Sequence, residues 1–179
     1  MGWKGYTDTR ERIFGEVADQ VIRHAPCDLL LLKIAEEKQF RRCLFPTAGG
    51  PHAQLAAEFL NVLGKAFEME VTASYVVPPG ASEDQRSEAE RWIEKTLVHF
   101  DVTLPLETQL IEAESVAGGL ALASRDCDLV VIGAAKEPLF RKMLLGEIPE
   151  KVARHSPASV LVVKRYEGTV KSLFKRLMG

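Results

Sequence analysis

Cysteine, excess positive charge and long apolar runs are all scarce in this sequence, and each scarcity excludes a class of protein. Only three cysteines occur among 179 residues and no two have the CxxC spacing, which excludes a disulfide-stapled domain and a cysteine-ligated zinc site. The net charge is −2, whereas nucleic-acid binders usually carry a large positive excess. No apolar run approaches the roughly 18 residues of a membrane-spanning helix, and the first fifteen residues are too polar for a secretory signal. We therefore expect a globular, cytoplasmic protein that binds no nucleic acid.

Short apolar segments alternate with amphipathic segments from about residue 41 onward. The expected strands are 42–47, 71–77, 105–111, 128–133 and 159–164. The expected helices are 51–67, about 82–100, 115–125 and 147–155. Strands that alternate with helices in this way form a parallel sheet with helices on both faces, because parallel neighbours need crossover connections. The pattern predicts one complete α/β domain over residues 41–166.

Residues 2–33 do not fit this alternation, since they contain one helix and one strand (28–33) but no strand that would open a domain. They match residues 133–164 without a gap, at a constant offset of 131 positions. The identical pairs are Gly2/Gly133, Arg10/Arg141, Gly15/Gly146, Glu16/Glu147, Val21/Val152, Arg23/Arg154, His24/His155, Pro26/Pro157, Leu30/Leu161 and Lys33/Lys164. We interpret residues 2–33 as the last helix and strand of a preceding homologous domain, with 34–40 as a linker and Met1 not a native start. Chance similarity between two amphipathic helix–strand units is the alternative.

Three glycines of the first copy have the spacing G-x2-G-x9-G, and the second copy holds Lys136 at the middle position. The six positions are Gly2, Gly5 and Gly15, then Gly133, Lys136 and Gly146. With the strand and turn segments 43–53, 123–133 and 155–164, this motif resembles the universal stress protein family. The resemblance implies a doubly wound five-stranded parallel sheet of order 3-2-1-4-5, in a Rossmann-like α/β/α sandwich. It also implies dimerisation through antiparallel last strands, so we expect segment 28–33 to pair with 159–164, or with a second copy of the chain.

A crevice is expected where the strand order reverses, because ligands of doubly wound sheets bind at the carboxyl ends of the strands at that point. Here it would lie between the turn after the first strand of the domain and the turn after its fourth strand. Its candidate residues are Thr47, Ala48, Gly49, Gly50, Gly133, Lys136, Gly146 and Glu147.

This crevice departs from the pattern that the resemblance implies for ATP-binding members. Those members have an aspartate after the first strand, a glycine at the middle motif position and a hydroxyl residue after the last glycine. Ala48, Lys136 and Glu147 stand at these positions here. A carboxylate in the first turn of a helix repels an arriving phosphate. Lys136, Arg141 and Lys142 are either an anion site or solvated surface charges, and we expect no ATP and no other cofactor.

The remaining histidines and cysteines form no recognisable reaction centre. His24 and His155 are repeat-equivalent and suit the capping of helix C-termini. His52, at the crevice mouth, is interpreted as a surface or capping residue rather than a functional one. Cys27 and Cys127 are interpreted as small buried hydrophobic residues, with redox sensing as the alternative. No P-loop, HExxH or GxSxG motif is present, so we predict no catalytic residue, no metal site and no enzyme activity.

Residues 167–179 form a basic segment with an apolar helical face. The residues of this apolar face are Val170, Leu173, Phe174, Leu177 and Met178. Such a face lies on an anionic membrane, in a partner's groove, or on the protein itself. With the resemblance, this segment leads us to expect a non-catalytic regulatory or assembly domain that responds to stress or to a ligand. Its expected setting is the cytosolic C-terminal region of a membrane transporter such as an amino-acid permease. The alternatives are a stand-alone ATP-binding stress protein, with weak hydrolysis or nucleotide-gated dimerisation, and an enzyme of the wider nucleotide-hydrolase-like fold class.

Overall fold

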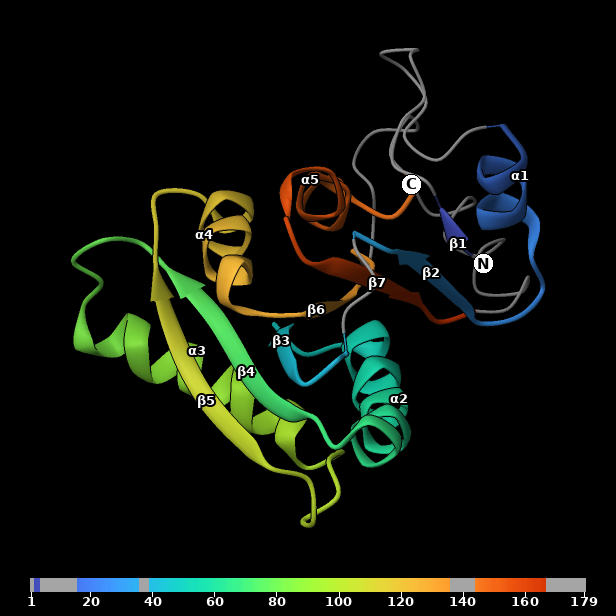
Figure 1. Cartoon of the computed structure of the whole chain (residues 1–179). Coiled ribbons are helices and arrows are strands. Elements are labelled where there is room, and N and C mark those ends of the chain that lie inside the picture. The colour runs from blue at the N-terminus through green and yellow to red at the C-terminus, as the bar shows by residue number, and fades with distance from the viewer. Residues whose placement is uncertain (1, 4–15, 36–38, 136–143, 167–179) are drawn as a thin grey trace, which may run out of the picture.

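The computed structural model describes residues 2–3, 16–35, 39–135 and 144–166, and it contains one mixed sheet (Figure 1). The sheet order is β1-β2-β7-β6-β3-β4-β5. The strands are β1 (Gly2–Trp3), β2 (Leu29–Lys33), β3 (Arg42–Pro46), β4 (Glu70–Val77), β5 (Leu106–Glu112), β6 (Leu129–Gly133) and β7 (Ser159–Lys164). The helices are α1 (Glu16–His24), α2 (Pro51–Phe67), α3 (Glu83–Leu97), α4 (Val116–Ala123) and α5 (Glu147–His155), with a 3₁₀ turn η1 (Ser124–Asp126) after α4.

The predicted α/β domain is confirmed over its five strands. The order β5-β4-β3-β6-β7 is 3-2-1-4-5 when the strands are counted along the domain, and all four pairings are parallel. The bounds of α2, α5 and β7 are those predicted. Two helix ends were wrong: the helix after Ser82 ends at Leu97 rather than near residue 100, and the segment 115–125 divides into α4 and η1. The sheet is also larger than predicted, because β2 and the unpredicted β1 extend the five strands into one continuous sheet.

Local sequence explains why the helices begin where they do. Pro51 occupies the first turn of α2, where its missing N–H costs nothing. Ser82 and Gln85 form a capping box at the start of α3, each side chain accepting the other's backbone N–H. Ser115 caps α4 by accepting the N–H of Gly118.

Two apolar layers enclose the sheet, one on each face. Helices α2 and α3 cover one face, where Phe45 and Val131 belong to the core cluster. Helices α1, α4 and α5 cover the other, where Leu44 and Val130 are buried (Figure 1). Because neighbouring residues of β3 and β6 face opposite layers, these strands read as uninterrupted apolar runs in the sequence.

The strand β2 pairs with β7 in an antiparallel ladder of five residue pairs, which we call the seam. Leu31 lies opposite Val162 at its centre, and these two residues are repeat-equivalent. Leu29 lies opposite Lys164, and the equivalent pair Lys33–Val160 closes the other end. The two copies are therefore related by an approximate two-fold axis between Leu31 and Val162. The expected pairing of the two segments is present within the chain.

The short strand β1 follows the same repeat. Gly2 lies opposite Leu32 in a parallel pairing, as Gly133 lies opposite Val163 in the second copy. Adding 131 to the residue numbers of the first pair gives the residue numbers of the second pair. The sequence repeat is thus also a repeat of strand register.

Hydrogen bonds across the seam repeat as well. The Ala35 N–H donates to Ser159 Oγ at 3.2 Å, and the Tyr166 N–H donates to Asp28 Oδ1 at 2.7 Å. Two lysines reach across to the end of a helix in the other copy: Lys33 Nζ donates at 3.0 Å to the carbonyl of Ser156, which directly follows α5, and Lys164 Nζ donates at 2.7 Å to Ile22 O in the last turn of α1. Carbonyls at a helix C-terminus lack partners within the helix, so a lysine donor stabilises them.

Candidate functional site

A crevice of about 540 Å³ opens where the strand order of the domain reverses. Its walls are the ends of β3 and β6, the later part of β4, the start of α2, and residues of α3, α4 and the first turn of α5. This is the place that the sequence analysis expected.

The structure brings together five of the eight candidate residues in this lining. They are Thr47, Ala48, Gly49, Gly50 and Gly133. Gly146 and Glu147 are not part of the lining, since Gly146 is buried against Ala135 and the Glu147 carboxylate pairs with Lys151 Nζ at 2.5 Å on the surface of α5. Lys136, with its neighbours Arg141 and Lys142, lies outside the described residues.

Two glycines of the predicted site, Gly133 and Gly146, are required by the fold itself. A Cβ on Gly146 would lie 2.2 Å from the Ala135 Cβ, and its φ of +99° disfavours other residues. A Cβ on Gly133 would lie 3.0 Å from the backbone nitrogen of Ala53, where α2 begins against β6. Their presence therefore needs no phosphate to explain it.

The described lining carries no aspartate, glutamate, lysine or arginine. The first turn of α5 also makes a weak anion seat, because Pro149 has no backbone N–H to donate. The nearby Ala135 N–H is already used, since it donates to Leu145 O at 2.7 Å. On this side of the crevice, the described residues therefore offer few of the donors that a phosphate group needs.

The polar side chains of the crevice mostly serve the fold. Thr47 Oγ1 lies 2.8 Å from Thr96 Oγ1 and accepts the Gly49 N–H at 3.0 Å, so its hydroxyl is occupied. His52 is buried and its Nδ1 accepts the Arg165 N–H at 3.0 Å, which places the ring proton on Nε2 and anchors the chain after β7. Ser74 differs from both: its hydroxyl is fully buried and has no hydrogen-bond partner among the described residues.

Sequence reasoning missed most of the crevice walls. The apolar members come from segments far apart in the chain, namely Tyr75, Val76, Trp92, Val116, Leu120, Ile132, Ile148 and Pro149. Trp92 lies on α3, and nothing in a helical period says that its ring would lie against the turn at Gly49, as it does. Pro149 in the first turn of a helix was a readable signal, since a proline there removes an amide donor.

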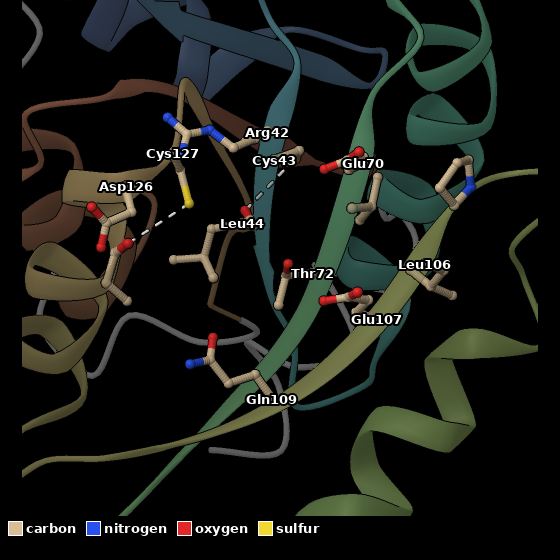
Figure 2. A pocket seen from close by; sticks show the side chains of 13 residues that line it. Arg42, Cys43, Leu44, Glu70, Thr72, Leu106, Glu107, Gln109, Asp126 and Cys127 are labelled. Carbon is tan, nitrogen blue, oxygen red and sulfur yellow. Dashed lines mark hydrogen bonds between the residues drawn. The ribbon is translucent and has the colours of Figure 1, made fainter.

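A second pocket, of about 620 Å³, lies at the opposite ends of the strands (Figure 2). Arg42 and Cys127 face each other there, beside Glu70, Glu107 and Asp126. Burial raises the pKa of the Cys127 thiol, with the nearby Asp126 and Asp128 adding to the rise against the effect of Arg42. The thiol is therefore protonated at neutral pH and a poor nucleophile.

The other cysteines and histidines divide into confirmed and wrong predictions. Burial also raises the pKa of the Cys43 thiol. Cys27 is exposed, so the interpretation of Cys27 as a buried hydrophobic residue was wrong. The capping prediction for the equivalent histidines is confirmed: His24 Nδ1 lies 3.0 Å from Gln20 O, and His155 Nδ1 lies 2.8 Å from Lys151 O. Among the described residues, no group of three or more His, Cys, Asp or Glu side chains is placed to hold a metal ion.

Known proteins resemble this chain in sequence and in fold. The model of the universal stress protein family matches residues 1–33 and 39–164. A universal stress protein of Methanocaldococcus jannaschii is 25% identical over 146 residues, which are 72% of this chain and 85% of that protein. Two solved structures share the fold. A universal stress protein from Archaeoglobus fulgidus has a TM-score of 0.65 at 19% identity, over 93% of this chain and 60% of its own. A universal stress protein in complex with cAMP has a TM-score of 0.54 at 16% identity, over 70% of this chain and 97% of its own.

The chain thus spans less than two thirds of the Archaeoglobus fulgidus protein, although the alignment covers nearly all of this chain. The family match covers residues 1–33 and 39–164, which together make up most of the chain. The chain belongs to the universal stress protein family.

Proposed function

We propose that this chain is a non-catalytic regulatory and assembly domain whose working surface is the seam. The observation that carries this proposal is the agreement of the seam with the sequence repeat, in ladder register and in paired side-chain bonds. A surface that pairs with its own equivalent about a two-fold axis is an isologous interface. In this chain both halves of such an interface are present, so a β7 strand that would otherwise be an exposed edge is covered.

The seam also supports a tandem arrangement, in which residues 2–33 belong to a preceding copy of the domain. The family match falls into two segments that separate at the proposed linker, and the register of β1 on β2 repeats that of β6 on β7. The proposed action is mechanical: a change at the crevice alters the packing of α5 and β7, and so alters the seam.

The crevice is proposed not to serve ATP, because its described lining carries no charge and Pro149 weakens the anion seat of α5. Titration calorimetry of nucleotide-free protein with MgATP tests this. We expect no heat of binding at micromolar nucleotide.

Micromolar MgATP binding would instead favour the alternative of an ATP-binding stress protein with weak hydrolysis or nucleotide-gated dimerisation. The solved relative in complex with cAMP is the observation that keeps this alternative in view. Ile148→Trp, which places a large ring at the crevice mouth, should abolish such binding, whereas Leu122→Trp on the outer surface of α4 should leave it intact.

The proposed setting is the cytosolic side of a membrane transporter. Its support is the basic amphipathic segment 167–179, which lies outside the described residues. No helix among the described residues is long and apolar enough to cross a membrane. An immunoblot of fractionated source cells, with an antibody against the exposed charged helix around residues 83–95, tests the setting. A membrane-bound band much heavier than 19.8 kDa supports it, and a band of that mass in the soluble fraction contradicts it.

A further inference from the structure

We infer that the C-terminal segment of this chain, residues 167–179, occupies the crevice and closes it with the apolar face predicted from its sequence. The inference goes beyond the proposed function, because the seam does not depend on what fills the crevice. It assigns the apolar face to one of the three surfaces that the sequence leaves open, namely the protein itself. The crevice is then self-inhibited, since an external ligand enters only when the segment leaves.

The described chain ends at the rim of the crevice. Beyond β7, the Arg165 N–H donates to Nδ1 of His52 at 3.0 Å, and His52 itself lines the crevice. Strand β7 lies next to β6, whose last residues Ile132 and Gly133 are also part of the lining (Figure 1). Residues 167–179 follow directly, and as a helix they would extend about 20 Å. The segment is therefore tethered beside the crevice and is long enough to reach over it.

The crevice walls offer the segment an apolar surface. Trp92, Leu120 and Ile132 come from three different elements and line the same space. At the rim, Val116 of α4 and Ile148 of α5 are each 38% exposed, although both are large apolar side chains. Exposed apolar side chains that gather at a groove usually mark a binding site. The volume of about 540 Å³ suits the few side chains that one helical stripe presents.

The segment has the complementary pattern. Five of its residues are apolar and recur at the spacing of one helical face, namely Val170, Leu173, Phe174, Leu177 and Met178. Its three basic residues lie outside this stripe, and the chain as a whole has a net charge of −2, so the rest of the molecule carries the opposite charge. A short amphipathic helix gains most of its stability by packing its apolar stripe on another surface.

Occupation of the crevice also connects it with the seam. The segment continues directly from β7, and the bond between Arg165 and His52 joins the end of that strand to the crevice wall. Release of the segment is therefore a change at the crevice that reaches β7. This is the kind of change through which the proposed regulation would act.

Cross-linking locates the segment directly. The full chain carries Cys27→Ser, which removes the exposed native thiol, together with Phe174→Cys and a rim cysteine, Val116→Cys. A short bismaleimide should link the two positions within one chain at least about tenfold faster than with Leu122→Cys as the matched variant, because docked residues react at a high effective concentration. Leu122 lies on the same helix, is 61% exposed and is not part of the lining. Ile148→Cys supplies the same test from α5 if the first rim variant does not fold, and a chain without a rim cysteine controls for links to the remaining native thiols.

Tryptophan fluorescence measures the cover that the segment provides. Trp3→Phe leaves Trp92, in the crevice wall, as the single tryptophan of the full chain. In this background Phe174→Asp should raise the acrylamide quenching of Trp92 by about twofold, because a carboxylate is unstable in an apolar crevice and the segment is released. Ser172→Asp adds the same charge outside the apolar stripe and should leave the quenching unchanged.

Several results would overturn the inference. Equal cross-linking at Val116 and Leu122, or equal quenching in Phe174→Asp and Ser172→Asp, would show that the segment does not dock in the crevice. A cross-link that joins two chains, seen as a doubled mass, would assign the crevice to a second copy. Binding of the full chain to anionic phospholipid vesicles, without a rim cross-link, would assign the apolar face to a membrane. Each of these results leaves the seam standing, since the seam is tested separately by oligomeric state.

Discussion

The two copies of the last helix and strand have matching local structure but different burial. Both helices end on a histidine that bonds to the carbonyl four residues earlier, and both strands have the same register across the seam. Yet β7 pairs with β6 at five positions, whereas in the described part of the chain β2 pairs with β1 at two. Leu161 is only 6% exposed, while its equivalent Leu30 is half-buried. Local sequence therefore sets the elements and their register, and the neighbouring elements set how much apolar surface they bury.

The largest effect is expected when two repeat-equivalent leucines, Leu161 and Leu30, are each replaced by alanine. Leu161→Ala should lower the free energy of unfolding by about 3 kcal/mol, because it leaves a cavity in a packed core. Leu30→Ala should lower it by about 1 kcal/mol, since its side chain buries less surface. Urea denaturation of both variants measures the difference, and equal losses would show that the two copies are equally packed.

The next effect concerns Glu150 in α5, the equivalent of Asp19 in α1. Glu150 is 3% exposed, and its Oε1 accepts the N–H groups of Leu144 at 2.7 Å and Leu145 at 3.0 Å. Glu150→Ala should cost about 2–3 kcal/mol because both amides lose their acceptor, whereas Glu150→Gln keeps an acceptor oxygen and should cost less. Thermal melts of the two variants at neutral pH measure this.

The same residue predicts a pH dependence. Burial raises the pKa of Glu150, and the Asp19 carboxylate adds to the rise, so the folded state holds this proton to higher pH than the unfolded chain does. The stability that the residue contributes is therefore present at low pH and falls as pH rises above about 4.5. The cost of Glu150→Gln should shrink over that range. A cost that grows with pH would show that the carboxylate is stabilised when charged.

A smaller effect is expected from the lysines of the seam. Lys33→Met and Lys164→Met each remove one charge-assisted bond to a helix-end carbonyl and should each cost about 1 kcal/mol. Similar costs in chemical denaturation would sharpen the two-fold correspondence. A large cost for one variant alone would limit that correspondence to the backbone.

The fold was largely predictable because its signals are local. Pro51, the Gly146–Glu147 step and Pro157 mark where helices begin and end, and the bounds of α2 and α5 followed from them. The repeat predicted the seam because both copies carry the same pattern. By contrast, β1 was missed because a two-residue strand depends on its partner β2 and not on its own sequence.

The candidate site was predictable in position but not in composition. The turn residues from Thr47 to Gly50 were found because glycines mark a turn. Ser74 and Trp92 were not assigned to the site, because which side chains meet at the crevice depends on how β4 and α3 pack around it. Glu147 was placed at the crevice by its motif position, but its ion pair with Lys151 turns it to the surface.

The most direct test of the proposed self-complementary seam is the mass of the domain without its N-terminal copy. Removal of residues 1–35 uncovers the β7 edge, and light scattering combined with size-exclusion chromatography then reports the oligomeric state. The account predicts a dimer joined through β7, which Val162→Asp at the centre of the ladder returns to a monomer. A folded monomer at high protein concentration would contradict the claim that this surface pairs with its own equivalent.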